Sequence, residues 1–120
     1  RAVNANAGHR LPTGDPERSV WIELAVIGAA GDTLARVERR IEQRYQWSPV
    51  VKKLADDRLA PGDSATVTLR YRVPGGAYRL VARAINSRIS DANADYHRLP
   101  ASYPRRAEVA RVERRGGAVR

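Results

Sequence analysis

Apolar and polar residues alternate through two runs of the chain that are separated only by a Pro-Gly-Gly turn. In the first run, residues 65–73, the apolar positions are Ala65, Val67, Leu69, Tyr71 and Val73. In the second run they are Tyr78, Leu80, Ala82 and Ala84. Because successive side chains of a β-strand point to opposite faces, a two-residue period restricts these runs to strands. We therefore predict strands over 65–73 and 78–85, joined as a β-hairpin.

A second hairpin is predicted nearer the N-terminus. Residues 19–27 are rich in β-branched and aromatic side chains and carry a single charge, Glu23, which is typical of a central strand. Residues 28–32 then have the composition of a turn. Residues 33–47 fit both helical and alternating spacing, and the preceding turn favours a strand that pairs with 19–27.

The remaining internal segments give weaker signals. Residues 50–61 show no clear period and are expected to be irregular. The alternation stops after Asn86, and Ser90 is a candidate N-cap for a short helix over 91–98. Asp91 then lies in the first turn of that helix, where a negative charge is favourable.

The length of 120 residues indicates one domain. Several antiparallel strands with turns about every 10 residues predict an all-β fold, an immunoglobulin-like antiparallel β-sandwich with one short helix near the C-terminus. We predict that the sandwich, including an N-terminal histidine loop, covers residues 1–104. Residues 105–120 are expected to be a C-terminal extension, because their alternation at Val109 and Val112 is weak and Gly116-Gly117 is expected to fray.

The ends and the hydropathy of the chain give two further expectations. The chain starts with Arg1 and shows no signal peptide, so we expect a processed chain or a piece of a longer one. No apolar run approaches the ~20 residues that a membrane-spanning helix needs, so no transmembrane segment is expected.

Composition excludes some functions and disfavours others. The chain has no cysteine, which excludes disulfides, thiolate zinc sites and covalent attachment of haem c to this chain. The net charge is +9, and Lys52 and Lys53 are the only lysines among 22 basic residues. An anionic partner such as nucleic acid is one interpretation of this charge. The arginines are interleaved with glutamates and no nucleic-acid-binding motif accompanies them, so we do not expect nucleic acid to be the partner.

Sequence signatures of catalysis are absent. The chain contains no Gly-rich phosphate loop, no His-Glu-x-x-His and no Gly-x-Ser-x-Gly. His9 and His97 are its only histidines, and a three-ligand metal site formed by both with an aspartate is a weak alternative. We therefore predict that the protein is not an enzyme.

His9 lies between Gly8 and the stiff turn Pro12-Thr13-Gly14-Asp15-Pro16. Neutral imidazole is a good ligand for iron and other transition metals. A histidine held on a rigid loop can complete the coordination of a metal that another domain carries, with Asp15 or a backbone carbonyl orienting its ring. The alternative is a turn-stabilising or merely exposed histidine, and the same alternative applies to His97.

The run Ala7-Gly8-His9-Arg10-Leu11-Pro12-Thr13-Gly14-Asp15-Pro16-Glu17-Arg18 resembles a segment of multihaem c-type cytochromes of the cytochrome c-554 type. In that family a haem-bearing region is followed by a C-terminal, all-β, immunoglobulin-like domain that opens with Gly-His-x-x-Pro-Thr-Gly. The runs Leu59-Ala60-Pro61-Gly62-Asp63 and Asn93-Ala94-Asp95-Tyr96-His97-Arg98-Leu99 also resemble that domain. The resemblance therefore extends from about residue 4 to about residue 104.

This resemblance implies extracytoplasmic electron transfer, either periplasmic or at the cell surface. The chain lacks the family's Cys-x-x-Cys-His sites, so any haem c is carried by a partner domain or chain. The resemblance makes His9 a candidate axial ligand of the partner's haem iron and His97 a second candidate. Arg10 and Arg98 become candidates for pairing with haem propionates, because guanidinium binds carboxylates in a bidentate manner. The implied function is a non-catalytic accessory domain that caps haems.

An alternative function needs no haem. A structural or adhesive β-domain of an extracellular assembly would use open sheet edges to pair with neighbouring subunits, as a homo-oligomer or a filament. The histidines would then have no ligand role. A haem-bearing partner in the purified particle separates this alternative from the cytochrome interpretation.

Overall fold

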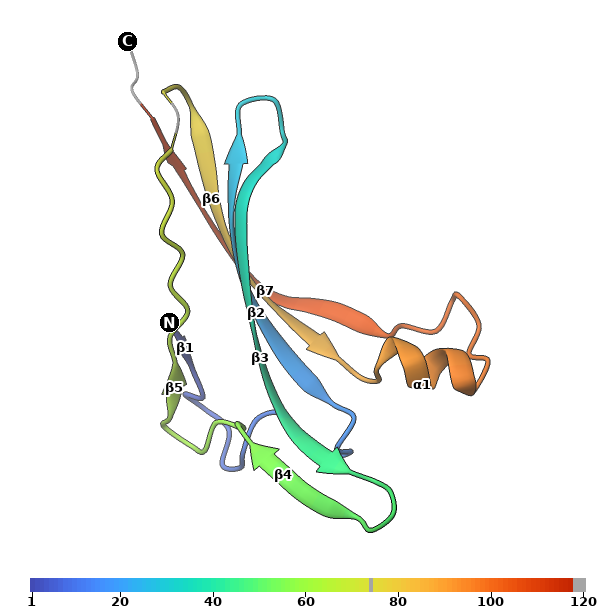
Figure 1. The fold of residues 1–120 in the computed structure, drawn as a ribbon. Coiled ribbons are helices and arrows are strands. Elements are labelled where there is room, and N and C mark those ends of the chain that lie inside the picture. The colour runs from blue at the N-terminus through green and yellow to red at the C-terminus, as the bar shows by residue number, and fades with distance from the viewer. Residues whose placement is uncertain (74, 118–120) are drawn as a thin grey trace.

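The computed structural model describes residues 1–73 and 75–117 (Figure 1). A five-stranded antiparallel sheet has the order β4 (Lys52–Asp56), β3 (Thr33–Gln46), β2 (Ser19–Gly28), β6 (Tyr78–Ser87) and β7 (Arg106–Gly116). A second sheet contains only β1 (Ala2–Val3) and β5 (Ser64–Ala65). The helix α1 (Asp91–Tyr96) precedes β7. The fold is therefore all-β with one short helix, as predicted.

The hairpin predicted for the N-terminal half is confirmed. β2 and β3 pair in antiparallel register, with Leu24 opposite Val37, and β2 has β6 on its other side. Gly28 N–H donates to the carbonyl of Asp32 at 2.8 Å, which closes the turn. Residues 33–47 are thus almost entirely strand, and β2 is the central strand that its apolar composition indicates.

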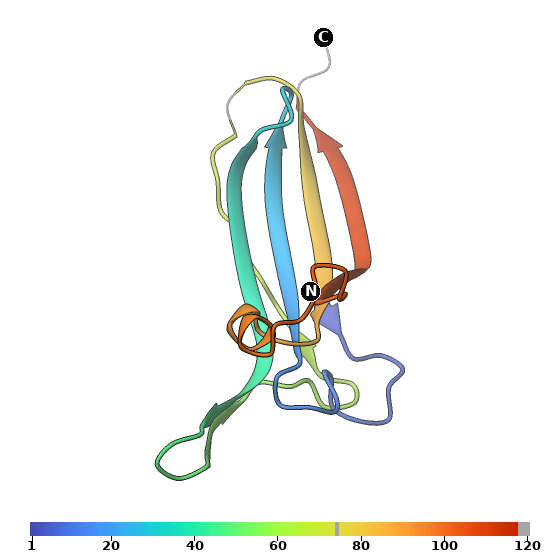
Figure 2. The same ribbon diagram turned by 90° about the vertical axis from the view of Figure 1, so that its right-hand side faces the viewer.

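The hairpin predicted between residues 65–73 and 78–85 is wrong. The strand β5 stops at Ala65, and β6 pairs with β2 and β7 instead. Residues 66–73 still alternate between half-buried and exposed positions up to Leu69. They run along one face of the five-stranded sheet, on the side of β3 (Figures 1 and 2). β6 thus pairs with β2 and β7 rather than with the segment that precedes it in sequence. Pro74, in the predicted turn, lies outside the described residues.

The expectation that residues 105–120 form an extension is also wrong for the part that is described. Residues 106–116 form the edge strand β7, which pairs with β6 from Ser87 opposite Arg106 to Tyr78 opposite Gly116. The proposed domain boundary at residue 104 therefore cuts through one continuous sheet. Residues 118–120 lie outside the described residues. Residues 50–61 contain the strand β4, where an irregular segment was expected.

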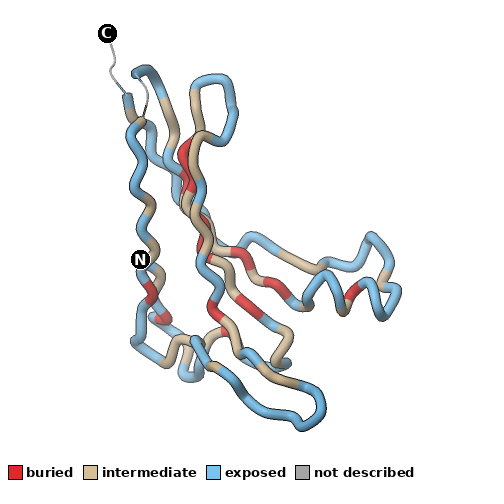
Figure 3. The backbone as a smooth tube through the Cα atoms, in the orientation of Figure 1, coloured by how far each residue is buried: buried red, intermediate tan, exposed pale blue. Residues whose placement is uncertain are grey.

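The two faces of the sheet differ in character. On one face, Ile22, Ile41 and Ala65 of β5 form a buried cluster, against which Ala2 of β1 and Val67 pack. On the opposite face, Glu23 is only 5% exposed and lies between Arg36 and Arg83. Figure 3 shows buried positions along the middle of the sheet, whereas β4 and β7 are mostly exposed.

The helix α1 begins as predicted and ends two residues early. Asn93 N–H donates to Ser90 Oγ at 3.2 Å, so Ser90 is the N-cap. The helix ends at Tyr96, and Arg98 adopts a φ of 53° that cannot continue it. Among the residues described, no helix combines the length and the apolar character needed to cross a membrane.

Candidate functional site

The loop that carries His9 is anchored by Asn4, a buried residue with 1% exposure. Its side-chain Nδ2 donates to the carbonyl of His9 at 2.8 Å and to the carbonyl of Leu59 at 3.0 Å. Its backbone N–H donates to Asp63 at 2.9 Å, and its carbonyl accepts from Gly62 at 2.8 Å. Asn4 therefore joins the main chain at His9 to the turn that leads into β5.

The segment after His9 is tied to the same neighbour. Leu11 and Leu59 exchange two backbone hydrogen bonds of 2.9 Å, and Pro12 beside them is buried. Further along, Asp15 Oδ1 accepts from Glu17 N–H at 2.8 Å, and the carbonyl of Asp15 accepts from Arg18 at 2.9 Å. The main chain is thus held on both sides of His9, although the histidine itself is exposed.

The His9 ring has an orienting contact. Its Nδ1 lies 3.1 Å from the carbonyl oxygen of Arg10. A carbonyl oxygen can only accept, so this contact requires the proton to sit on Nδ1. In the neutral ring, Nε2 then carries the free lone pair, which is the form that binds a metal. The carbonyl of Arg10 therefore orients the His9 ring, a role for which Asp15 was the other candidate. The Asp15 side chain instead accepts from Glu17 N–H within its own turn.

Two glycines flank this part of the loop, and only one needs to be glycine. Gly14 has a φ of +89°, a conformation that side-chain-bearing residues rarely adopt. Gly8 lies outside that region, and a Cβ added there meets no atom within 4 Å. The turn at residues 12–16 is therefore fixed by Gly14, Pro12 and Asp15, while Gly8 leaves open space beside His9.

His97 lies at the C-cap of α1, where its backbone N–H donates to the carbonyl of Asn93 at 2.9 Å. Its ring contacts Tyr96 edge-on at a centroid distance of 5.2 Å, and the residue is exposed. His97 also lines a polar pocket of about 460 Å³ together with Asp15, Glu17 and Arg18. The structure thus brings His97 close to the far end of the loop that carries His9.

Ion pairs hold α1 in this position. The guanidinium of Arg105 lies 3.2 Å from Asp91 and 3.0 Å from Asp95, and that of Arg106 lies 2.8 Å from Asp91. Hydrogen bonds from Arg106, and to a smaller extent from Arg105, lower the pKa of Asp91. Ser90 N–H also donates to Glu17 Oε2 at 3.2 Å, which links the helix cap to the histidine loop.

The two arginine candidates are both exposed. Arg10 makes one long contact of 3.5 Å, from Nη1 to the carbonyl of Arg58. Arg98 follows His97, and its backbone N–H donates to Asp95 at 3.0 Å. Both guanidinium groups are therefore accessible to an anionic ligand.

The alternative of a three-ligand metal site made by this chain alone is not supported by the described residues. Within 1–73 and 75–117, no three His, Asp or Glu side chains lie close enough together to hold a metal ion.

Sequence reasoning missed Asn4 as a determinant of the site. Its partners at residues 59–63 are more than fifty positions away in the sequence, so no local sequence pattern predicts these contacts. The three runs quoted for the resemblance lie near one another: residues 59–63 hold the His9 loop, and Asn93 and His97 line a pocket with Glu17 at the end of that loop. Comparisons with protein-family models, curated proteins and solved structures give no match to this chain.

Proposed function

We propose that this chain is a non-catalytic accessory domain of an extracytoplasmic multihaem cytochrome assembly. It caps haems c that a partner domain or chain carries, and it donates the imidazole of His9 as an axial ligand. We further propose that the fold is an immunoglobulin-like sandwich whose second layer is incomplete. This proposal joins the resemblance of residues 7–18 to the geometry of the histidine loop.

The observation that supports it most directly is the contact between His9 Nδ1 and the carbonyl of Arg10. Metal-binding histidines usually donate their second ring N–H to a carbonyl or carboxylate, which fixes the ring and leaves the other nitrogen as the ligand. His9 has this arrangement on an exposed loop that Asn4 holds. When bound, the haem would supply the redox chemistry, and this chain would hold the ring and exclude water from one haem face.

Arg10 and Arg98 have supporting roles in the proposal. Both are exposed guanidinium groups next to a histidine in sequence, and each can pair with a haem propionate. His97 is the second ligand candidate. Its contact with Tyr96 is compatible with that role, although its pocket is lined by the acidic residues Asp15 and Glu17.

The ligand role can be tested with a ferric haem-c peptide that has one proximal histidine and an open sixth position. Titrating the intact 120-residue protein into this probe is expected to shift the Soret and visible bands from high-spin to low-spin positions. The variant His9→Ala is expected to lose the shift, because the free lone pair on Nε2 is the proposed sixth ligand. The variant His97→Ala is the matched control and is expected to retain most of it.

Two results would contradict the proposal. If His9→Ala and the unaltered protein shift the spectrum equally, His9 is not the ligand. If only His97→Ala loses the shift, the ligand is the residue at the C-cap of α1 and the histidine loop is structural. Circular dichroism of each variant shows whether the fold is retained.

A further inference from the structure

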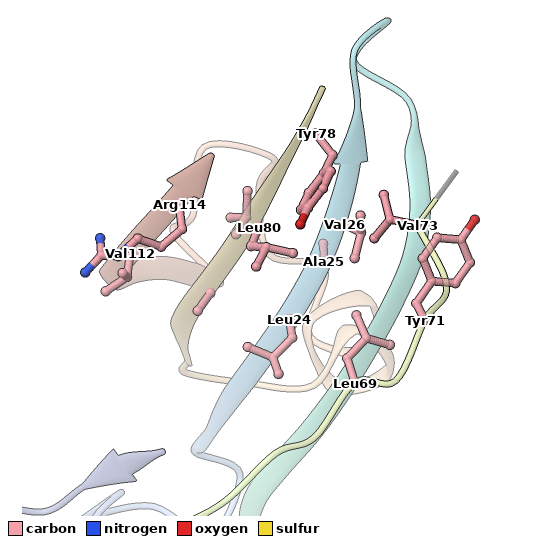
Figure 4. A pocket seen from close by; sticks show the side chains of 12 residues that line it. Leu24, Ala25, Val26, Leu69, Tyr71, Val73, Tyr78, Leu80, Val112 and Arg114 are labelled. Atoms are coloured by element: carbon pink, nitrogen blue, oxygen red, sulfur yellow. The ribbon is translucent and has the colours of Figure 1, made fainter. Parts of the chain in front are cut away.

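An apolar groove of about 440 Å³ lies between residues 66–73 and the five-stranded sheet (Figure 4). One wall comes from alternate positions of the extended segment, Leu69, Tyr71 and Val73. The floor comes from three neighbouring strands, with Leu24 on β2, Leu80 on β6 and Val112 on β7. The groove is therefore a space between a complete sheet and a single extended segment.

The floor is not covered by the rest of the chain. Leu80 is 43% exposed and Val112 is 51% exposed. The whole chain exposes 8488 Å², whereas a compact monomer of 13.3 kDa exposes about 6,450 Å². The excess of about 2,000 Å² is spread over the whole chain, and the exposed side chains of the groove floor contribute to it. The floor is thus open to a partner.

The backbone of residues 66–73 also has room for a partner. No backbone–backbone hydrogen bond joins this segment to another residue within 1–73 or 75–117, although the carbonyl of Thr66 accepts from Arg39 Nη1 at 3.0 Å. Its side chains nevertheless begin with the alternation of a strand, in which Val67 and Leu69 are half-buried and Thr66 and Thr68 are exposed. A strand edge with unpaired N–H and C=O groups is a template for another strand.

The neighbouring pair of strands shows where the added strand would lie. β1 pairs with β5 in antiparallel register, with Val3 opposite Ser64 and Ala2 opposite Ala65. A strand that continues the line of β1 would therefore lie opposite residues 67–73. Figure 2 places residues 66–73 behind β3, with β6 and β7 towards the other side of the sheet. The added strand would cover this uncovered floor.

Charge defines the chemistry of the partner. Arg70 and Arg72 are exposed on residues 66–73, and neither forms an ion pair with a described residue. Side chains of the added strand that face outwards would lie beside Arg70 and Arg72, where carboxylates pair favourably across strands. Side chains that face inwards would meet the apolar floor.

We propose that the groove binds a β-strand of a partner polypeptide in which apolar and acidic residues alternate. The strand pairs antiparallel with residues 67–73, places its apolar side chains on β6 and β7, and completes the second layer of the fold. This binding site does not depend on haem ligation by His9.

The proposal is tested with a fluorescent peptide as long as residues 67–73, in which Val or Ile alternates with Asp or Glu. Titration with the intact protein is expected to give saturable binding. A scrambled peptide of the same composition, which breaks the alternation, is expected to bind about tenfold more weakly or less. Amide hydrogen exchange is expected to show new protection at residues 67–73 in the complex.

Variants of the protein locate the peptide. Leu80→Ser, on the groove floor, is expected to weaken binding by about tenfold. Leu54→Ser is the matched control, because Leu54 is 60% exposed on β4 and does not line the groove. Arg72→Glu is expected to weaken binding of the acidic peptide. It is expected to strengthen binding of a peptide that has lysines in place of the acidic residues.

Three results would overturn the proposal. Equal binding of the scrambled peptide would show non-specific apolar association. Slow amide exchange at residues 67–73 in the free monomer would show that this edge is already paired. Concentration-dependent dimerisation that protects the same amides and excludes the peptide would make a second copy the occupant. None of these results involves haem, so the ligand role of His9 is tested separately.

Discussion

Asn4 controls the position of His9 through two side-chain hydrogen bonds and two backbone hydrogen bonds. The side chain holds the carbonyl of His9 itself, and the backbone holds the turn at Gly62 and Asp63. A metal ligand on a loop is effective only when its main chain is fixed, because ordering the loop otherwise costs free energy upon binding. Asn4 is therefore a positioning residue for the proposed site.

We predict that Asn4→Ala lowers the free energy of unfolding by about 2 kcal/mol, because it leaves the carbonyl of His9 without its donor and the carbonyl of Leu59 with only the Leu11 N–H. The same variant should weaken binding of the haem-c peptide, since the histidine loop becomes mobile. Asn6→Ala, at an exposed position of the same loop, is the control and should change stability by less than about 0.5 kcal/mol. Urea denaturation measures the first effect and the Soret titration the second. Equal effects of the two variants would contradict the anchoring role.

At this scale, sequence predicts what is local. The left-handed conformation of Gly14 and the Ser90 cap follow from short-range chemistry that the residue types announce. The anchor at Asn4 depends on residues brought together only by folding. Gly8, by contrast, is a glycine whose backbone has no positive φ.

Strand elements follow the same rule. β2 and β3 are neighbours in sequence, so their turn and composition predict the pairing. β6 instead pairs with β2, fifty or more residues away, and no single-sequence pattern encodes that choice. β7 was missed because arginine and glutamate fill its solvent face and only Val109 and Val112 interrupt them with large apolar side chains.

β7 gives a direct test of the boundary between domain and extension. We predict that a chain shortened to residues 1–104 does not fold cooperatively, because β6 loses its whole ladder with β7 and α1 loses Arg105 and Arg106. Thermal unfolding by circular dichroism and the dispersion of amide proton signals check this. A cooperative transition and native-like dispersion would show instead that the remaining strands suffice.

Glu23, in the middle of β2, connects three strands of the sheet. Its Oε1 accepts from Arg83 Nε at 2.7 Å, and Oε2 accepts from Arg36 Nε at 2.8 Å. Burial raises the pKa of Glu23, but the hydrogen bonds and charges of both arginines outweigh that effect, so that its pKa lies below the usual 4.5. A carboxylate with a lowered pKa stabilises the fold above its unfolded-state pKa, and the stabilisation is lost as pH falls through the folded-state pKa.

We therefore predict that Glu23→Gln lowers the free energy of unfolding at neutral pH by about 2 kcal/mol. The difference from the unaltered protein should shrink as pH falls below the ordinary pKa of 4.5 and through the lower folded-state pKa, because Glu23 then becomes protonated. Urea denaturation across this range, on both proteins, measures the difference. A difference that stays constant with pH would mean that the charge of Glu23 contributes nothing to stability.

The whole molecule is less compact than its length suggests. Its radius of gyration is 17.3 Å, against about 13.6 Å for a compact domain of 120 residues. The charged face is internally paired through Glu23, Glu38, Glu108 and Glu113, whereas the opposite, apolar face is partly uncovered. This distribution favours a protein partner over the apolar face, as proposed above, with acidic groups beside Arg70 and Arg72.

The proposed cytochrome role is tested most directly by the visible absorption spectrum of the natively purified particle that contains this chain, recorded oxidised and reduced. We predict sharp low-spin haem bands, part of which convert to high-spin bands in a particle carrying His9→Ala. His97→Ala should alter the spectrum less. A featureless spectrum, or low-spin bands and redox potentials that His9→Ala leaves unchanged, would contradict the assignment of His9 as a haem ligand.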